Sequence, residues 1–490
     1  MSTPPLASGP EGPGALRPLL DTVLDALRDG HEARGGPLPA GGPESVARRL
    51  RDAVADVLPE QGTEDALRVL VQALAEGAAD PADPLCVAHL HCPPLAVATA
   101  ADLAASALNP SMDSWDQAPA ASELEALVTE TLATEVYKRA NEPHKSNKPH
   151  KSNKPHKSNE PHKSTALVTT GGTESNQLAL LLAREAYAGV RLICGANAHH
   201  SLLRAAWLLG LPDPVVVPAP AGVMDLAALD EALTDCGDQR LRREQGPRGS
   251  RSTLLVAATA GTTDAGLIDP LPDIADLCEA HGTRLHIDAA YGGGLLFSDH
   301  HRGKLDGLDR AHTVTLDLHK LGWQPVAAGL LAVKDPHDLD ALDHRADYLN
   351  ADDDTEAGLP DLLGRSLRTS RRPDILKVAV TLKTLGRTGL GALVDQVCAR
   401  AVELADLVEA HPGFELYDPP TLSTVLFRPA EASDEAVATV RRTLLHEGRA
   451  VLGRALLDDR LWLKATLLNP HTRPGDLAAL LKLVEGHTPR

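Results

Sequence analysis

The sequence predicts an α/β fold with a mostly parallel central sheet and a small C-terminal α+β domain. Between Val168 and Val333, short runs of aliphatic and β-branched residues alternate with helical patterns, which is the order of strands and crossover helices in a parallel sheet. From about Arg372 onward, the pattern changes to a long helix, two strand-like runs and a last helix. A chain of 490 residues is too long for one ordinary core, so two or three packed units are expected.

The composition is that of a globular protein and excludes several functional classes. Hydrophobic residues make up 43% of the chain, which excludes a wholly disordered or collagen-like protein. A formal net charge of -19 has the wrong sign for binding nucleic-acid phosphates. No apolar run reaches the roughly 20 residues that span a bilayer, and six cysteines are too few for a disulfide framework. We therefore expect a cytoplasmic protein with no nucleic-acid or membrane partner.

The first 125 residues are predicted to form two segments. Residues 1–40 are rich in Gly and Pro and contain one short amphipathic stretch, so they are expected to be a flexible extension. Helical periodicity is clear from Glu44 to Glu76, which predicts an N-terminal helical segment over residues 41–125.

Residues 126–370 are predicted to form the large domain. Its strands are expected at six short apolar runs, Leu192-Ile193, Val215–Val217, Leu254–Ala258, Arg284–Ile287, Val314–Leu316 and Leu330–Val333. Four copies of a hexapeptide, NEPHKS or NKPHKS, interrupt this domain at residues 141–164. Proline in every copy forbids a regular helix and no side chain is apolar, so a disordered insert is expected. The four histidines leave metal binding as an alternative.

Residues 371–490 are predicted to form the small C-terminal domain. Strands are expected at Thr424–Phe427 and Leu461–Thr466, followed by a helix near Leu477 to Leu483.

A glycine pair in the large domain is a candidate phosphate site. The run Thr169-Thr170-Gly171-Gly172-Thr173-Glu174-Ser175-Asn176 leads directly into a helical pattern. Glycines let the backbone approach a ligand closely, and a helix N-terminus presents unpaired N–H groups that favour an anion. An ordinary helix start is the alternative.

Two further motifs carry a carboxylate and an amine at strand ends. Asp288 ends the run Leu285-His286-Ile287-Asp288, where open α/β sheets bind ligands. Lys320 follows the run Thr315-Leu316-Asp317-Leu318-His319 and is a candidate imine-forming nucleophile. A capping Asp and a solvated surface Lys are the alternatives. A phosphate cradle, an acid for a protonated ring nitrogen and an imine-forming Lys are together what a pyridoxal phosphate (PLP) site requires.

These motifs, in this order, give the chain its resemblance to a known family. It resembles the group II PLP-dependent amino-acid decarboxylases over about Asp83 to Asn469. The matching motifs are AHLHCPP, NPSMDSWDQ, TTGGTESN, AHHSLLRAA, ATAGTTDAGLIDPLPDIA, HIDAAYGGG, DLHK, ADYLN, TSRRPDILK and LLNP. The resemblance implies an aspartate-aminotransferase-like (fold type I) PLP enzyme that acts as a carboxy-lyase and works as a homodimer.

The resemblance also implies roles for individual residues. Lys320 is implied to form the imine with PLP, Asp288 to pair with the pyridinium nitrogen and His199 to stack on the ring. The phosphate is implied to lie against Gly172, Thr173 and His319, with Asp317 nearby, whereas Thr263 and Ala290 line the ring. Leu318 departs from the family, in which Pro is common at this position, and this puts the local turn in doubt.

Tyr348, in the motif ADYLN, matches the family's loop tyrosine, which donates a proton to the substrate Cα. The surrounding segment from Asn350 to Pro360 is acidic with little to bury, which is typical of a mobile loop. An ordinary packed tyrosine is the alternative.

The resemblance favours a basic substrate. AHLHCPP, SMDSWDQ and the DYLN loop are similar to bacterial decarboxylases of lysine and of 2,4-diaminobutyrate. Asp113 and Asp116 are candidate partners for a distal ammonium, and Arg371 is a candidate partner for a carboxylate or, equally, a helix-start ion pair. Aromatic amino-acid decarboxylation, another PLP lyase or aldehyde synthase, and a non-catalytic binding protein remain alternatives. Cys86, His89, His91 and Cys92 are metal ligands by type, but no metal site is expected.

Overall fold

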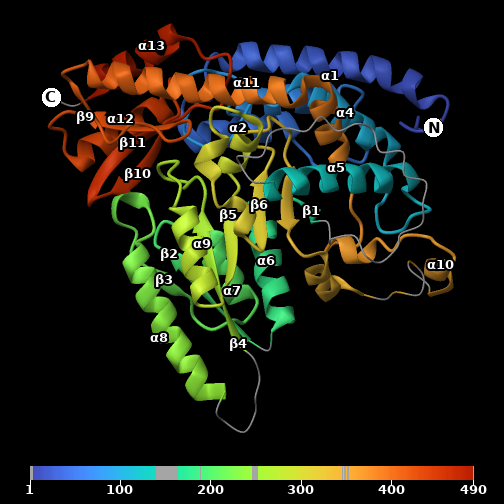
Figure 1. Ribbon diagram of the computed structural model, residues 1–490. Helices are drawn as coiled ribbons and strands as arrows, with labels where there is room; N and C mark the ends of the chain where they lie inside the picture. The colour runs from blue at the N-terminus through green and yellow to red at the C-terminus, as the bar shows by residue number, and fades with distance from the viewer. Residues whose placement is uncertain are drawn as a thin grey trace. The chain divides into compact units, whose positions relative to one another are not determined.

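The computed structural model describes residues 4–138, 164–187, 189–244, 252–344, 346, 349 and 352–488 (Figure 1). It divides into two compact units. We call Pro94–Ala105 with Pro110–Asp395 the central unit, and Met1–Pro93 with Ser106–Asn109 and Gln396–Arg490 the terminal unit. The hexapeptide repeat over 141–163 lies outside the described residues.

The central unit is built on a seven-stranded sheet, which confirms the predicted α/β class. Its strands are β1 (Thr165–Thr169), β2 (Gly189–Gly195), β3 (Val215–Val217), β4 (Ser252–Thr259), β5 (Arg284–Ala289), β6 (Thr313–Asp317) and β7 (Gly329–Val333), in the order β1-β7-β6-β5-β4-β2-β3. The pairs among β3, β2, β4, β5 and β6 are parallel. Only β7 runs against its neighbours β6 and β1, so the carboxyl ends of the other strands share one edge.

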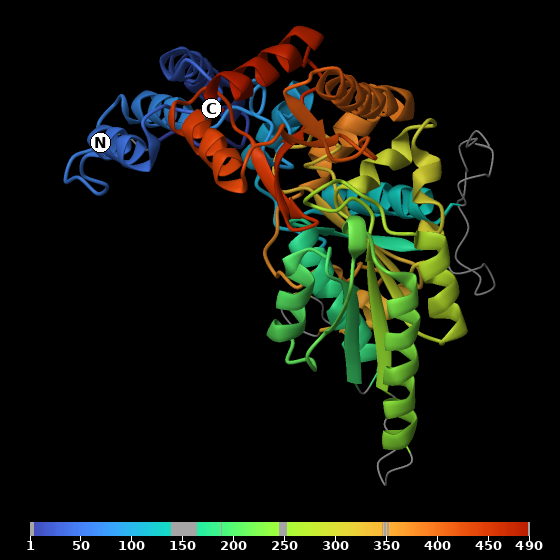
Figure 2. The same cartoon turned by 90° about the vertical axis from the view of Figure 1, so that its left-hand side faces the viewer.

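Helices cover both faces of this sheet, because each presents apolar side chains to the strands. Figure 2 shows α6 (Gly172–Ala186) and α7 (His200–Leu208), in green, on one side of the strands, and the yellow-green α8 (Leu226–Glu244) and α9 (Leu271–Ala280) on the other. Buried Leu180, Leu192, Leu202 and Leu255 belong to one hydrophobic cluster between α6, α7 and the sheet. The central unit also contains α5 (Pro119–Tyr137), α10 (Asp352–Glu356) and six short 3₁₀ turns, Pro220–Gly222, Gly292–Phe297, Arg302–Leu305, Leu308–Arg310, Pro336–Leu342 and Leu363–Arg365.

The terminal unit is a four-stranded antiparallel sheet with helices, as predicted for a small α+β domain. Its strands are β8 (Phe414–Leu416), β9 (Thr424–Pro429), β10 (Gly453–Leu457) and β11 (Arg460–Thr466), in the order β10-β11-β9-β8. Its helices are α1 (Gly12–Arg34), α2 (Gly42–Val54), α3 (Ala66–Gly77), α12 (Asp434–His446) and α13 (Pro474–His487). Two helices, α4 (Ala96–Leu108) and α11 (Ile375–Glu409), contribute residues to both units.

The boundaries of the two units differ from the predicted ones. We predict a flexible extension over 1–40, but the structure forms α1 there and packs it against α3. We also predict separate segments before residue 125 and after residue 371, whereas the terminal unit combines the two ends of the chain. The amide of Val87 donates to the carbonyl of Val451, and the carbonyl of Val87 accepts from Thr466. Such contacts join residues that a local sequence pattern does not relate.

Within the described residues, no helix combines the length and the apolar character needed to cross a bilayer.

Candidate active site

The glycine pair lies in the turn between β1 and the N-terminus of α6. Gly171 has φ of +151°, and a Cβ built on it would lie 2.9 Å from Cε1 of His319. A Cβ on Gly172 would lie 3.1 Å from Cβ of Ala290 and 3.2 Å from Oδ2 of Asp317. The first N–H groups of a helix have no intrahelical acceptor. The missing side chains therefore leave a cradle in which a small anion can approach these groups.

The end of β6 and the turn after it carry three polar residues, Asp317, His319 and Lys320. Nζ of Lys320 lies 3.0 Å from Oδ2 of Asp317, and Nε2 of His319 lies 3.5 Å from the same oxygen. Nδ1 of His319 accepts a hydrogen bond from the amide of Ala328, so its Nε2 carries the proton. Burial lowers the pKa of His319 and keeps the ring neutral near pH 7. The turn after β6 thus presents an amine and a neutral N–H donor beside a buried carboxylate.

Asp288, in β5, is only 6% exposed, and both of its oxygens accept hydrogen bonds. Oδ1 accepts from the amide of Ala290 at 3.0 Å. Oδ2 accepts from Nδ2 of Asn176 at 2.8 Å. These two donors hold the carboxylate in one orientation, in which it can accept a hydrogen bond from a ligand nitrogen.

His199 caps the N-terminus of α7, with its backbone in the extended region. Nδ1 of the ring accepts from the amide of Ser201 at 3.3 Å and lies 2.8 Å from the hydroxyl of the same residue. Burial lowers the pKa of His199, so the imidazole is neutral near pH 7. A neutral, fixed ring can stack on a flat ligand.

The other implied cofactor residues differ in exposure. Ala290 is buried directly after β5 and approaches Gly172. Thr173 is exposed in the first turn of α6, and Thr263 is exposed in the turn after β4. Tyr348 lies outside the described residues.

The candidate substrate residues lie elsewhere in the central unit. Asp113 is 8% exposed and accepts from Nε2 of Gln117 at 2.7 Å, whereas Asp116 is exposed and accepts from Ser114. Arg371 is buried and pairs with Glu125 of α5, with 2.6 Å between Nη1 and Oε2. The helix-start ion pair with Asp374 is made by Arg372 instead.

Sequence reasoning missed three buried polar residues next to Asp288. Asn176, Ser201 and His286 are each 0% exposed, and all three lie within motifs quoted for the resemblance. The signal available was the polarity of His286 between the apolar residues Leu285 and Ile287, since a buried polar group requires a partner. Among the described residues, no group of three or more His, Cys, Asp or Glu side chains is arranged to hold a metal.

Comparisons with known proteins agree with this arrangement. The pyridoxal-dependent decarboxylase conserved domain matches residues 52–430. L-2,4-diaminobutyrate decarboxylase from Rhizobium meliloti (strain 1021) is 38% identical over 452 residues, which cover 89% of this chain and 84% of that protein. The enzyme of the same name from Acinetobacter baumannii is 31% identical over 86% of this chain and 83% of its own length.

A solved structure agrees over almost the whole chain. It is the glutamate decarboxylase domain of diaminobutyrate-pyruvate transaminase and L-2,4-diaminobutyrate decarboxylase from Vibrio parahaemolyticus. The TM-score is 0.80 at 30% sequence identity, and the match covers 99% of this chain and 97% of that one.

Proposed function

This chain belongs to the pyridoxal-dependent decarboxylase family, and from that premise we propose that it decarboxylates an L-amino acid whose side chain carries an ammonium group. The first candidate substrate is L-2,4-diaminobutyrate, followed by ornithine and lysine. The observation that carries the proposal is the 38% identity to a diaminobutyrate decarboxylase over 89% of this chain and 84% of that enzyme.

The residues at the strand ends fit PLP, the cofactor of the family. The cradle at Gly171 and Gly172, which side chains would fill, suits the phosphate. Within the described residues, the buried Oδ1 of Asp317 has no hydrogen-bond partner, so a donor on a bound ligand would satisfy it. Lys320 would attach the cofactor, and Asp288 would hold its ring nitrogen protonated.

Bound PLP supplies an electron sink for the bond that breaks when CO2 leaves. Asp288 would stabilise positive charge at the ring nitrogen of the bound cofactor. His199 would cover one face of the ring and exclude water from it. Lys320 would hold the cofactor before the substrate binds, and Tyr348 would donate a proton to the substrate Cα.

A distal ammonium on the substrate needs a nearby carboxylate, because an unpaired buried cation is costly. Asp113 supports this part of the proposal, because it is a buried carboxylate whose Oδ1 accepts from a neutral amide in its own turn. Asp116, which is exposed, is the second candidate. Arg371 is a candidate partner for the substrate carboxylate, because the described part of the chain offers no hydrogen-bond partner to its buried Nε and Nη2.

The test is to load the purified chain with PLP and measure CO2 and amine from each amino acid separately. We expect turnover with diaminobutyrate, ornithine or lysine to exceed that with dopa, tryptophan or aspartate. Lys320→Ala is the control, since it removes both the lysine-linked absorption band and turnover. Faster turnover of an aromatic or acidic amino acid would contradict the proposed substrate class. The absence of the absorption band would contradict the proposal that the chain is a PLP enzyme.

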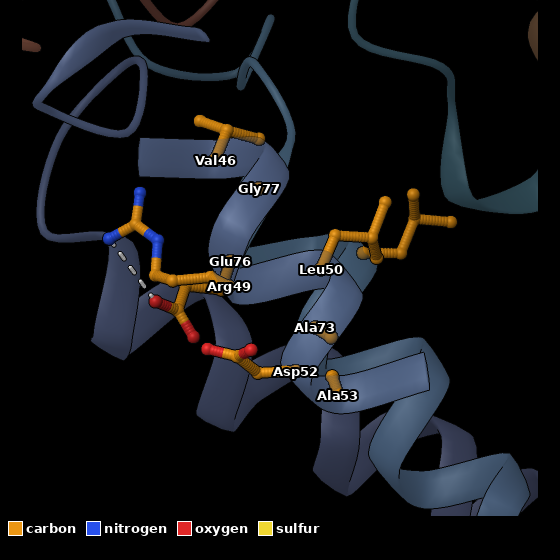
Figure 3. Close-up of a pocket in the computed structure, with 9 residues that line it drawn as sticks. Val46, Arg49, Leu50, Asp52, Ala53, Ala73, Glu76 and Gly77 are labelled. Carbon is orange, nitrogen blue, oxygen red and sulfur yellow. Dashed lines mark ion pairs between the residues drawn. The ribbon is translucent and has the colours of Figure 1, made fainter. Parts of the chain in front are cut away.

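The proposal includes a homodimer, supported by apolar side chains on the helices of the terminal unit. No residue of α2 or α3 is buried, and α1 to α3 expose Leu19, Leu24, Leu27, Leu50, Leu67, Leu70 and Leu74. A cavity of about 300 Å³ lies between α2 and α3, with Val46, Leu50 and Leu74 in its lining and the ion pair Arg49–Glu76 beside them (Figure 3). Burying such a surface is favourable.

Light scattering on the holoenzyme tests this assembly. We expect the mass of a dimer for the wild type and of a monomer for Leu50→Glu/Leu74→Glu. Leu456→Glu, on an equally exposed leucine of β10, is the matched control. A monomeric wild type would contradict the assembly.

A cytoplasmic location completes the proposal. It is supported by the small number of cysteines, six in 490 residues, which is too few for a disulfide framework and suits a reducing compartment.

A further inference from the structure

Asn176 is the centre of a buried hydrogen-bond network behind the proposed cofactor site. It lies in the second turn of α6 and is 0% exposed. Its side chain contacts residues of β5, β6 and α7, so one amide joins four elements of the central unit. None of the roles that the family resemblance implies uses this residue.

The orientation of the amide is determined by its neighbours. Oδ1 accepts from Oγ1 of Thr315 at 2.9 Å and lies 3.0 Å from Nε2 of His286. Nδ1 of His286 lies 2.9 Å from the hydroxyl of Thr313, which can donate to it. Burial lowers the pKa of His286 to about 4, so the ring is neutral and carries a single N–H. Because Nδ2 of Asn176 faces the carboxylate of Asp288, Oδ1 faces His286, and the N–H is therefore on Nε2. Rotating the amide by half a turn would place its N–H groups against these donors.

The two N–H groups of the amide then point toward the cofactor site. One donates to Oδ2 of Asp288 at 2.8 Å, and the other donates to Oγ of Ser201 at 2.9 Å. Because Ser201 accepts this bond, its own proton is free to donate to Nδ1 of His199 at 2.8 Å. All four hydrogen-bonding positions of the Asn176 side chain are therefore used.

We propose that Asn176 is the positioning residue that orients both groups holding the cofactor ring, Asp288 directly at the ring nitrogen and His199 through Ser201 at the ring face. The inference rests on the proposed function, in which Asp288 and His199 have these roles. Asn176 touches neither substrate nor cofactor and acts only through its neighbours.

The network suits this role because its groups other than Asp288 are neutral. The donors to Asp288 are neutral amides, so none of them replaces the ring nitrogen as its charged partner. An amide held by two acceptors and two donors cannot rotate without losing several buried bonds. Asp288, at the nitrogen of the cofactor ring, and His199, at the face of that ring, are thus held in one relative geometry.

The experiment compares folded holoenzyme variants by cofactor affinity, by the circular dichroism induced in the cofactor band, and by the pH dependence of its absorbance. For Asn176→Ala we expect the PLP dissociation constant to rise about 10- to 100-fold, the loss of a hydrogen bond to a charged group. The induced dichroism should weaken, the absorbance should titrate at a different pH, and kcat should fall more than KM rises.

Ser201→Ala removes a single hydroxyl. It tests the orientation of His199 separately from that of Asp288. It should weaken the induced dichroism but leave the pH dependence of the absorbance as in the wild type. Ser298→Ala is the matched control, because Ser298 is also buried but its hydroxyl bonds to Asp395 and to the amides of His300 and His301, which have no proposed role in the site. It should lower the melting temperature without changing any signal of the bound cofactor.

Asp288→Ala distinguishes a failure of the proposed function from a failure of the positioning role of Asn176. If it retains wild-type cofactor signals, the role of Asp288 in the proposed function is wrong. If Asp288→Ala changes the signals while folded Asn176→Ala keeps wild-type affinity, dichroism and pH dependence, only the positioning role is overturned. If Asn176→Ala does not fold, unchanged dichroism in Ser201→Ala would show that Asn176 does not orient His199 through Ser201.

Discussion

At the scale of single residues, Gly172 shows how the absence of a side chain can be part of a site. Its position between Ala290 and Asp317 leaves about 3 Å for an added Cβ, closer than carbon and oxygen atoms normally approach. A methyl group there would occupy the cradle that we assign to the phosphate.

Gly172→Ala is expected to weaken PLP binding. Overpacking costs about 1–3 kcal/mol, so the dissociation constant should rise roughly 5- to 150-fold. The measurement is a titration of the apoprotein with PLP followed by absorbance. Gly475→Ala, in the first turn of α13 with nothing within 4 Å of the added carbon, is the control. Equal affinities for both variants would contradict the cradle.

Tyr348→Phe is expected to change the product and not merely the rate. Without the hydroxyl, the proton reaches Cα slowly, and the electron-rich carbon is left to react with oxygen. The variant should release aldehyde and ammonia when it is given substrate in air, and product analysis under air and under nitrogen measures this. The normal amine at the normal rate would contradict the role of Tyr348.

At the scale of elements, the ion pair between Arg371 and Glu125 joins α5 to the segment that precedes α11. The two side chains are 2% and 6% exposed, so their charges compensate each other away from water. Removing one partner of such a pair leaves an uncompensated buried charge.

Glu125→Ala is expected to destabilise the fold by about 3–5 kcal/mol for this reason. Urea unfolding of the variant against the wild type measures the change. The exposed pair of Glu435 and Arg442 on α12 is the comparison, and Glu435→Ala should cost less than about 1 kcal/mol. Similar losses in both variants would show that burial of the first pair has little energetic effect.

The elements also show what a sequence pattern can and cannot predict. Strands β2 to β7 coincide with predicted apolar runs, because alternation of strand and helix is a local signal. The antiparallel pairing of β1 with β7 is not local, since Thr165 pairs with Val333. Helix α1 was not predicted because Pro13 and Pro18 are typical of irregular segments. The helix packs on α3, and composition does not reveal such a contact.

The same distinction applies to the site. Lys320, Asp288 and Gly172 could be proposed as site residues because their chemistry and their place at element ends are visible in the sequence. The contact between Asn176 and His286 could not be predicted, since it joins residues 110 positions apart. The pairing of Arg371 with Glu125 spans 246 positions and was equally invisible.

At the scale of the whole molecule, buried histidines make stability depend on pH. Burial lowers the pKa of His286 and of His312 to about 4 in the folded state, whereas an unfolded histidine titrates near 6.5. As pH falls below about 6.5, the unfolded chain binds protons that the folded chain does not. Stability is therefore lost between about pH 6.5 and pH 4.

Lowering the pH from 7 to 5 should cost about 2 kcal/mol of unfolding free energy for each of these histidines. His312→Asn retains an acceptor for the amide of Leu285 but does not titrate. Urea unfolding at both pH values should show that the variant loses about 2 kcal/mol less than the wild type. An identical loss would mean that His312 does not contribute.

The combination of the two chain ends in the terminal unit has a consequence for synthesis of the protein. The ribosome completes the central unit, within Pro94 to Asp395, while the partners of the first 93 residues are still missing. Val87 receives its strand neighbours only when Val451 and Thr466 have emerged. Until then, apolar side chains such as that of Val87, which is 3% exposed in the complete fold, lack the residues that bury them and are a hazard for a nascent chain. The N-terminal segment is therefore made first but completed last.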